Sequence, residues 1–236
     1  MKAIMFDFDG TLTSESSNVW KAIWKELGYD TGDNSYFREL YWKFMTKNIT
    51  HQQWCDLTCE AFCKKSMKES DLIHIAERMK LINGAEDTFK VLKDKGYSLN
   101  IISGNIDTVI NNVLGDNLKY FDYINSNNLI FDENGFLLGI KGTKYDFETK
   151  ANFIREYSKK TNINANDICF VGNGKNDEWA HLSGCKTLCI NPYNTDELNQ
   201  TKWHKVIKRV DNLTEILPYV CENSEIMFSD SCICKL

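Results

Sequence analysis

Hydrophobic and polar positions follow two different patterns along this chain, one before and one after about residue 83. In the first part, from residue 14 on, apolar residues recur every three or four positions, as in Val19, Ile23 and Leu27. This period is typical of helices that bury one face, and no convincing strand pattern occurs there. The spacing predicts four helices, over residues 19–27, 36–44, 50–63 and 70–81.

After residue 83, short apolar runs alternate with helical patterns, which indicates a parallel sheet with helices packed on it. A run of the same kind opens the chain at residues 3–6. Asn134-Gly135 lies between two apolar segments and predicts a hairpin within residues 121–142. Further strands are expected at 97–102, 168–171 and 187–190, and helices at 85–95, 107–114, 147–157 and 176–182.

These patterns predict an α/β fold, with a Rossmann-like parallel sheet core flanked by helices and an inserted all-helical domain. About 70 helical residues placed after the first strand cannot extend a parallel sheet, so we expect them to form a separate small unit. The expected division is a core of residues 1–13 and 84–220, a helical domain of residues 14–83, and a tail of residues 221–236.

The composition is that of a folded globular protein, with 42% hydrophobic residues among 236. The formal net charge of −5 leaves no basic footprint for nucleic acid, and no apolar stretch approaches the length of a membrane span. The first residues enter a predicted strand directly instead of forming a signal peptide, so we expect a cytoplasmic protein. The nine cysteines are interpreted as free thiols, and Cys55, Cys59 and Cys63 as core residues on one helix face.

Two carboxylates stand directly after the first predicted strand, in the segment Asp7-Phe8-Asp9-Gly10-Thr11. The strand reads as buried on both faces, and ligands of open α/β sheets bind beyond the carboxyl ends of such strands. Two aspartates one residue apart can serve as a nucleophile and a proton carrier, and both can help to hold a hard cation. The alternative interpretation is an ordinary turn, since Asp and Gly favour turns.

Two later strand ends also carry polar residues that suit phosphate chemistry. Ser103-Gly104 follows the predicted strand over residues 97–102 and offers a hydroxyl together with backbone N–H groups. Asn173 and Asp177 lie in a Gly-rich segment between a predicted strand and a predicted helix. Either segment alone could be a turn, so their interpretation depends on their order along the chain.

Taken in that order, the three segments resemble motifs I, II and IV of the haloacid dehalogenase superfamily of phosphotransferases. The resemblance covers residues 1–220 and implies a phosphatase of the phosphoserine-phosphatase-like branch, with a C1-type helical cap between motifs I and II. The implied reaction begins when Asp7 attacks phosphorus and forms an aspartyl-phosphate, while Asp9 protonates the leaving oxygen and later activates water. The implied cofactor is Mg²⁺, held by Asp7, Asp9, Asn173 and Asp177, and the implied partner is a small phosphorylated metabolite.

The resemblance also implies which residues bind the phosphoryl group. A lysine early in the helix after the hairpin would offset the charge of that group and of the nucleophile. Lys150 and Lys144 both compete for this role, and Lys150 is preferred because a helical position is held more rigidly than a turn. The resulting phosphate-binding set is Gly10, Thr11, Ser103, Gly104 and Lys150.

The sequence departs from the family pattern at two places. Asn173 stands where the pattern has an acidic metal ligand, so fewer negative charges would hold the cation. Phosphoserine phosphatases place a Glu shortly after motif I and an Arg in a cap helix, whereas Glu15 is one residue early and residues 52–56 contain no Arg. An amino-bearing leaving group is the alternative to phosphoserine, because Trp side chains can bind a cation. Its candidate selecting residues are Glu15, Trp20, Trp24, Trp54 and Asp56.

Two functions of other classes stay open at this point. A phosphomutase or phosphotransferase would use the same aspartyl-phosphate but exclude water from it. A catalytically weak protein that binds a phosphorylated ligand is the second alternative, and Asn173 is the residue that suggests it. The oligomeric state and the physiological substrate are not encoded in any pattern that we recognise.

Overall fold

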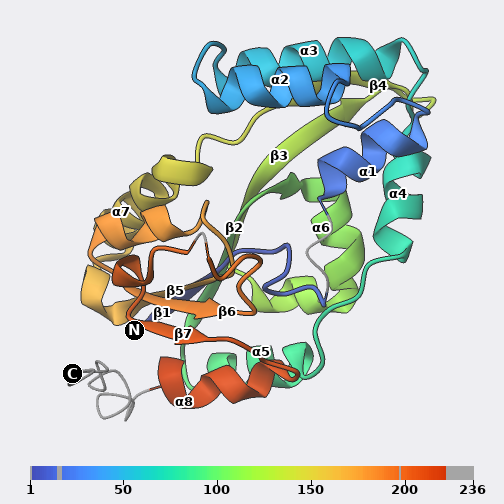
Figure 1. The fold of residues 1–236 in the computed structure, drawn as a ribbon. Coiled ribbons are helices and arrows are strands. Elements are labelled where there is room, and N and C mark those ends of the chain that lie inside the picture. The colour runs from blue at the N-terminus through green and yellow to red at the C-terminus, as the bar shows by residue number, and fades with distance from the viewer. Residues whose placement is uncertain (1, 15–17, 197, 222–236) are drawn as a thin grey trace.

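A seven-stranded sheet runs through the centre of the molecule (Figure 1), in a computed structural model that describes residues 2–14, 18–196 and 198–221. The strand order is β4-β3-β2-β1-β5-β6-β7, and all pairs are parallel except β3 with β4. The predicted α/β class is therefore confirmed. The strands are β1 (Ala3–Phe6), β2 (Ser98–Ile106), β3 (Tyr123–Phe131), β4 (Leu137–Lys141), β5 (Ile168–Gly172), β6 (Lys186–Ile190) and β7 (Lys205–Ile207).

Strand β1 lies in the middle of the sheet and is buried on both faces. Ile4 and Phe6 pack on one face with Phe89 of α5, whereas Met5 packs on the other face with Ile154 of α7. This two-sided burial explains the uninterrupted apolar run that opens the chain. The helices beside the sheet are α5 (Ala85–Asp94), α6 (Asp107–Leu114), α7 (Lys150–Thr161) and α8 (Leu217–Val220).

Four helices form the region between β1 and α5, which we call the cap: α1 (Val19–Glu26), α2 (Tyr36–Met45), α3 (His51–Cys63) and α4 (Glu69–Glu77). Side chains begin three of them, since Asn18, Ser35 and Thr50 each accept a hydrogen bond from a backbone N–H three residues on. Trp24 and Phe62 are fully buried between the helices. The four predicted helices are thus all present.

The cap shares its hydrophobic core with part of the sheet. Leu129, Leu137 and Ile140 of the β3–β4 hairpin and Val109 of α6 belong to the same buried cluster as Trp24. In Figure 1, α2 and α3 lie over the hairpin, which is the antiparallel end of the sheet. The cap is therefore all-helical as predicted, but it does not pack as a separate unit, because the hairpin completes its core.

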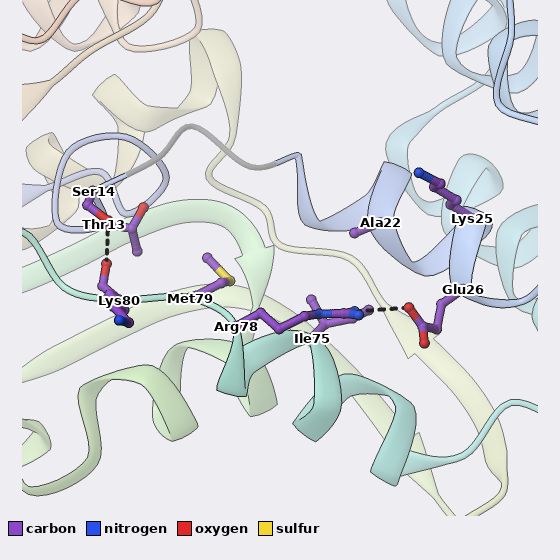
Figure 2. A pocket seen from close by; sticks show the side chains of 9 residues that line it. All are labelled: Thr13, Ser14, Ala22, Lys25, Glu26, Ile75, Arg78, Met79 and Lys80. Atoms are coloured by element: carbon purple, nitrogen blue, oxygen red, sulfur yellow. Dashed lines mark hydrogen bonds and ion pairs between the residues drawn. The ribbon is translucent and has the colours of Figure 1, made fainter.

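Two short segments connect the cap to the sheet and run side by side. The N–H of Ser14 donates to the carbonyl of Lys80 at 3.0 Å, and the N–H of Ile82 donates to the carbonyl of Leu12 at 2.9 Å. A cavity of about 680 Å³ lies next to this crossing, lined by residues of α1, α4 and the crossing segments (Figure 2). The pairing fixes where the chain leaves and re-enters the sheet.

Several boundaries differ from those predicted. Helix α4 ends at Glu77 instead of continuing to residue 81, because residues 80–82 are extended and pair with the other connecting segment. Strand β2 continues to Ile106, so Ser103 and Gly104 lie inside the strand, near a shift in its register against β3. The sheet hydrogen bonds decide this boundary, and they cannot be read from local composition.

Short 3-10 helices replace or extend some predicted α-helices. Residues 178–183 form a 3-10 helix, and the helix predicted over 147–157 begins as one before α7 starts at Lys150. Strand β7 was not predicted, and the predicted tail lies outside the described residues beyond Cys221. The 3-10 helices are η1 (Gly115–Tyr120), η2 (Phe147–Thr149), η3 (Ala165–Asp167), η4 (Glu178–Ser183), η5 (Gln200–Lys202) and η6 (Leu213–Ile216).

Three cysteines lie along α3 in the cap. Cys55 and Cys59 are buried in the cap core, as predicted. The prediction for Cys63 is wrong, because this residue at the end of α3 is exposed; its thiol lies 3.8 Å from that of Cys59 and donates to the carbonyl of Leu137 at 3.2 Å. Burial raises the pKa of the Cys55 thiol to about 12, which makes it an inert core residue.

Within the described ranges, no helix has the length and apolar character that crossing a membrane requires.

Candidate active site

Asp7 and Asp9 follow β1 at the carboxyl edge of the sheet, where the sequence predicts them. The N–H of Asp7 donates to the carbonyl of Val171 at 2.9 Å, which continues the pairing of β1 with β5 by one residue. From β1 the chain goes to β2 on one side and later returns to β5 on the other, and such a switch point is where open α/β sheets bind ligands. Asp7 is buried and Asp9 is partly buried.

Lys150 reaches Asp7 from the start of α7. Its Nζ donates to Oδ1 of Asp7 at 2.9 Å and to Oδ1 of Asp177 at 2.5 Å, and the side chain is fully buried. Burial alone would lower the pKa of the ammonium, but Asp177 and Asp7 outweigh burial and raise the pKa. Lys150 therefore remains a cation between two carboxylates. The preference for Lys150 over Lys144, which is exposed, agrees with this placement.

Asp177 holds Lys150 and the preceding loop in place. Its Oδ2 accepts hydrogen bonds from the N–H groups of Asn173 and Gly174 at 2.9 and 3.0 Å, while its Oδ1 accepts from Lys150. A Cβ at Gly172 would lie 2.6 Å from this carboxylate, so the close approach needs glycine. Because both oxygens accept hydrogen bonds, Asp177 positions Lys150 and the loop, and its role as a direct metal ligand stays a prediction.

The two aspartates after β1 hold their protons more tightly than free carboxyls do. Burial, together with the charge of Asp177, raises the pKa of Asp7 to about 7, against the opposing effect of Lys150. Burial and the charge of Asp7 raise the pKa of Asp9 well above its usual value. A group in this state can donate a proton near neutral pH, and a cation placed between the two carboxylates would relieve their repulsion.

The oxygen atoms at this edge fit a hard divalent cation by their chemistry. Asp7, Asp9 and Asn173 each offer a side-chain oxygen with no hydrogen-bond partner in the described part of the chain. Carboxylate and amide oxygens are the ligands that Mg²⁺ prefers. No three His, Cys, Asp or Glu side chains group as a metal site among residues 2–14, 18–196 and 198–221.

Ser103 and Gly104 lie beside these carboxylates on β2, the strand next to β1. Ser103 is buried, and its hydroxyl oxygen accepts a hydrogen bond from the N–H of Asn105 at 3.2 Å. The side-chain amide of Asn105 donates to Oδ1 of Asp9 at 2.9 Å. Sequence reasoning missed Asn105, whose only signal is its place two residues after Ser103. It ties the predicted phosphate-binding strand to the predicted proton carrier.

The backbone N–H groups of Gly10 and Thr11, two residues predicted to bind phosphate, are used within the turn after β1, whereas the buried hydroxyl of Thr11 has no hydrogen-bond partner among the described residues. The N–H of Gly10 donates to the hydroxyl of Thr13 at 2.9 Å, and that of Thr11 points back to the carbonyl of Phe8 at 3.3 Å. Gly10 has a φ of 69°, which turns the chain so that these groups satisfy one another. The N–H groups of Phe8 and Asp9 have no acceptor within the described residues, and they are therefore candidates to donate hydrogen bonds to a phosphoryl group.

The candidate selecting residues of the cap separate into different places. The indole N–H of Trp20 donates to the carbonyl of Gly104 at 2.8 Å, and the ring of Trp54 packs edge-on against Trp20 at 4.8 Å. Trp24 is buried in the cap core, so its predicted contact with a ligand is wrong. Asp56 is exposed and accepts a hydrogen bond from Gln52, and Glu15 lies outside the described residues.

Asp146 is a second residue that sequence reasoning missed. It precedes η2 in an irregular segment, and its charge contributes to raising the pKa of Asp7 and of Lys150. A Cβ at Gly104 would lie 2.6 Å from Oδ2 of Asp146, so this carboxylate faces the end of β2. No motif surrounds it, because its position follows from the loop between the hairpin and α7.

Known proteins similar to this chain point to one family. The family model of haloacid dehalogenase-like hydrolases matches residues 1–180. The phosphoserine phosphatase of Methanocaldococcus jannaschii is 26% identical over 224 residues, which covers 93% of this chain and 97% of that protein. The phosphoserine phosphatase of Archaeoglobus fulgidus is 30% identical over 180 residues, which covers 75% of this chain and 48% of that protein.

The fold agrees with solved structures of the same kind. A phospho-aspartyl intermediate analogue of phosphoserine phosphatase superposes with a TM-score of 0.71 at 25% sequence identity, covering 93% of this chain and 99% of that one. The match includes the cap as well as the sheet, since almost the whole of both chains is aligned. The chain therefore belongs to the haloacid dehalogenase-like hydrolases, in their phosphoserine-phosphatase-like branch.

Proposed function

We propose that this chain, a phosphoric monoester hydrolase by its family, cleaves a small phosphomonoester through an aspartyl-phosphate on Asp7 with the help of Mg²⁺. The observation that supports this most is the buried arrangement at the sheet edge, where Lys150 bridges Asp7 and Asp177. A lysine held in this way fixes the orientation of Asp7 and supplies a positive charge next to the position of an incoming phosphoryl group.

The first step is an in-line displacement at phosphorus. A carboxylate oxygen of Asp7 forms a bond to phosphorus while the bond from phosphorus to the ester oxygen breaks. The leaving oxygen takes the proton held by Asp9, whose raised pKa makes it a competent acid. The products of this step are the free alcohol and an acyl phosphate on Asp7.

The second step returns Asp7 to its starting state. Asp9, now a carboxylate, removes a proton from a water molecule, and the water oxygen bonds to phosphorus as the bond from phosphorus to Asp7 breaks. Inorganic phosphate leaves. Asn105 donates to one oxygen of Asp9 and thereby fixes the orientation of this carboxylate.

Charge on the phosphoryl oxygens has several partners in this arrangement. Lys150, the hydroxyl of Ser103 and the N–H groups of Phe8 and Asp9 are the donors that the fold brings to the edge of the sheet. Asp7, Asp9 and Asn173 would hold Mg²⁺, which when bound neutralises part of the same negative charge. Donors that are fixed before the reaction need no reorganisation during it.

The test is turnover of a panel of phosphomonoesters by the purified protein with and without Mg²⁺. We expect release of phosphate from at least one member, and a phosphoryl adduct on Asp7 after rapid acid quenching, detected by mass spectrometry. Asp7→Asn should abolish both signals. Absence of turnover for every member, or an Asp7→Asn variant as active as the parent, would refute the proposal.

Asn173 favours one second candidate, a protein that binds a phosphorylated ligand with little turnover. It removes one negative charge from the candidate cation site, so the affinity for Mg²⁺ is expected to be weaker than that of a site with a third carboxylate. Calorimetric titration with Mg²⁺ distinguishes the two, since an enzyme needs a site that fills at cellular concentrations. Turnover in labelled water separates both from a phosphomutase, which would transfer the phosphoryl group without incorporating the label.

The remaining expectations follow from this proposal. We propose small phosphorylated metabolites as the substrates and keep the cytoplasm as the expected location. The division into a core of residues 1–13 and 84–220 and a cap of residues 14–83 is also retained as a proposal, with the cap covering the site. The shared core with the hairpin predicts that the hairpin would move with the cap.

A further inference from the structure

The cap meets the sheet around the segment that follows the hairpin, residues 142–149. Nδ1 of His51 lies 3.1 Å from the carbonyl oxygen of Thr143, and Nζ of Lys47 lies 2.8 Å from the carboxylate of Glu148. These contacts come from α3 and from the end of α2. The segment is therefore held between the cap and the phosphate-binding edge of the sheet.

Asp146 is the acidic residue of this segment that faces the sheet. Its Oδ2 lies against Gly104, and its Oδ1 accepts a hydrogen bond from the N–H of Phe147 at 2.8 Å. The N–H and the hydroxyl of Thr149 both donate to the carbonyl of Asp146, at 3.0 and 2.6 Å. Phe147 has a φ of 48°, a conformation that side chains rarely adopt. The carboxylate is thus fixed in direction, with one oxygen left over.

The charge of Asp146 acts on both sides of the site. It contributes to raising the pKa of Asp7 and Lys150 in the core and of Tyr41 in the cap. These contributions agree with the position of the Asp146 carboxylate against Gly104, at the edge of the sheet that faces the cap. No salt bridge joins it to a lysine or arginine within the described residues.

Aromatic side chains of the cap contact Gly104 and Phe147, the two residues that lie against the carboxylate of Asp146. Trp20 contacts Gly104 through its indole N–H, and Phe44 packs edge-on against Phe147 with ring centres 5.7 Å apart. Trp54 joins these rings, with centres 4.8 Å from Trp20 and 6.0 Å from Phe44. A carboxylate beside aromatic rings is the combination that binds organic ammonium ions.

Among the described residues, no arginine forms an ion pair or a hydrogen bond with the segment around Asp146, where a carboxylate on the leaving group would lie. Each of the chain's four arginines is engaged elsewhere: Arg38 with Asp33, Arg78 with Glu26 (Figure 2), Arg155 with the carbonyl of Leu182, and Arg209 with Asp211. An amino acid leaving group would bring a negative carboxylate next to Asp146 without an arginine to bind it. The contacts described on this side of the site therefore combine the carboxylate of Asp146 with aromatic rings and include no arginine.

We propose that Asp146 selects substrates whose leaving group carries an ammonium group and no carboxylate, that is, phosphate esters of amino alcohols. In this assignment Oδ2 of Asp146 accepts a hydrogen bond from the ammonium, or faces its methyl groups where it is quaternary, and the rings of Trp20, Phe44 and Trp54 lie around it. This inference rests on the proposed phosphatase function and adds the substrate class. Asp146 acts on binding and orientation, and the bond-making steps remain those of Asp7 and Asp9.

The test compares three esters of similar size: 2-aminoethyl phosphate, the uncharged propyl phosphate, and phosphoserine. We expect kcat/KM of the parent protein to be at least about 10-fold higher for 2-aminoethyl phosphate than for either of the others. Asp146→Asn keeps the oxygen that accepts from Phe147 and removes the charge. It should lower kcat/KM for the ammonium ester by about 10- to 100-fold, mainly through KM, and leave propyl phosphate within about two-fold.

Glu148→Gln is the matched control, because it removes a charge from the same segment on the solvent side. It should leave the preference among the three esters unchanged. Equal turnover of 2-aminoethyl and propyl phosphate by the parent overturns the inference while the phosphatase function stands. An equal loss for both esters in Asp146→Asn also overturns it, because that result assigns Asp146 a purely structural role. Failure of all three esters together with the wider panel instead refutes the phosphatase function itself.

Discussion

The core side and the cap side of the candidate site are built in different ways. On the core side, Lys150, Asp7 and Asp177 form a buried ion network whose members hold each other at 2.5 to 2.9 Å. On the cap side, aromatic rings and single hydrogen bonds such as that from Trp20 to Gly104 make the contact. In the proposed function, the residues at the sheet edge therefore carry the reaction, whereas the cap and the segment around Asp146 determine which leaving group can bind.

Removing the central cation is expected to have the largest effect on the core side. Lys150→Met leaves the carboxylates of Asp7 and Asp177 buried without a partner, which costs about 3–5 kcal/mol of unfolding free energy at pH 8. It should also lower kcat by about 100-fold or more, because a fixed charge next to phosphorus is lost. Urea unfolding and steady-state kinetics measure the two effects.

Lys144→Met is the control for this experiment, since Lys144 is exposed in the same part of the chain and was the alternative candidate. It should change neither stability nor activity. If Lys144→Met were inactive and Lys150→Met active, the assignment of the core side would have to be reversed.

The raised pKa of Asp7 predicts a pH dependence of stability in the metal-free protein. Because the folded-state pKa of about 7 lies above that of an unfolded Asp, the folded state binds more protons between about pH 4 and pH 7. The free energy of unfolding should therefore fall as pH rises through this window, by at most about 4 kcal/mol from this group, and level off above it.

Denaturant unfolding at several pH values measures this slope. Asp7→Asn should remove the contribution of Asp7, and addition of Mg²⁺ should flatten the slope in the parent protein, since a bound cation stabilises the ionised form. A slope that is the same in Asp7→Asn would show that another group causes it. This outcome would contradict the interpretation that the buried carboxylates of the core side repel one another and that a bound cation relieves this repulsion.

Asn173 allows the core side to be made more like the usual pattern of the family. Asn173→Asp supplies a third carboxylate at the end of β5, so the affinity for Mg²⁺ should rise on the order of 10-fold. Calorimetric titration measures this change. Asn176→Asp adds the same charge three residues later and should have a much smaller effect, which separates coordination from general electrostatics. An unchanged affinity in Asn173→Asp would remove residue 173 from the proposed set of ligands.

The extent to which the sequence predicted the site differs between the two sides for a physical reason. Asp7 and Asp9 could be found because a strand end is visible in the apolar pattern, and Lys150 because the family resemblance implies a lysine early in the helix after the hairpin. Asn105 and Asp146 could not, because one lies on a strand that continues beyond its apolar run and the other lies in an irregular loop. Their contacts join segments far apart in the chain, and such contacts leave no local period.

The turn after β1 and the cap tryptophans were also predicted only in part, because their contacts do not follow from local sequence patterns. Gly10 and Thr11 were predicted to bind phosphate, and the turn formed at Gly10, with its φ of 69°, uses their backbone N–H groups internally. Trp20 and Trp24 are one helical turn apart on α1, and the same stripe serves both the cap core and the site. Which end of a stripe meets the sheet depends on how the helix is docked, and periodicity does not determine it.

The smallest expected effect lies on the cap side, at Trp20. Trp20→Phe keeps an aromatic ring beside Trp54 but removes the donor to the carbonyl of Gly104, and the loss of one neutral hydrogen bond is worth about 1 kcal/mol. We expect KM to rise by about three- to ten-fold with little change in kcat. Trp42→Phe, on the exposed face of α2, is the matched control. A change confined to kcat would contradict the comparison, because it would place Trp20 with the residues that carry the reaction instead of those that hold the substrate.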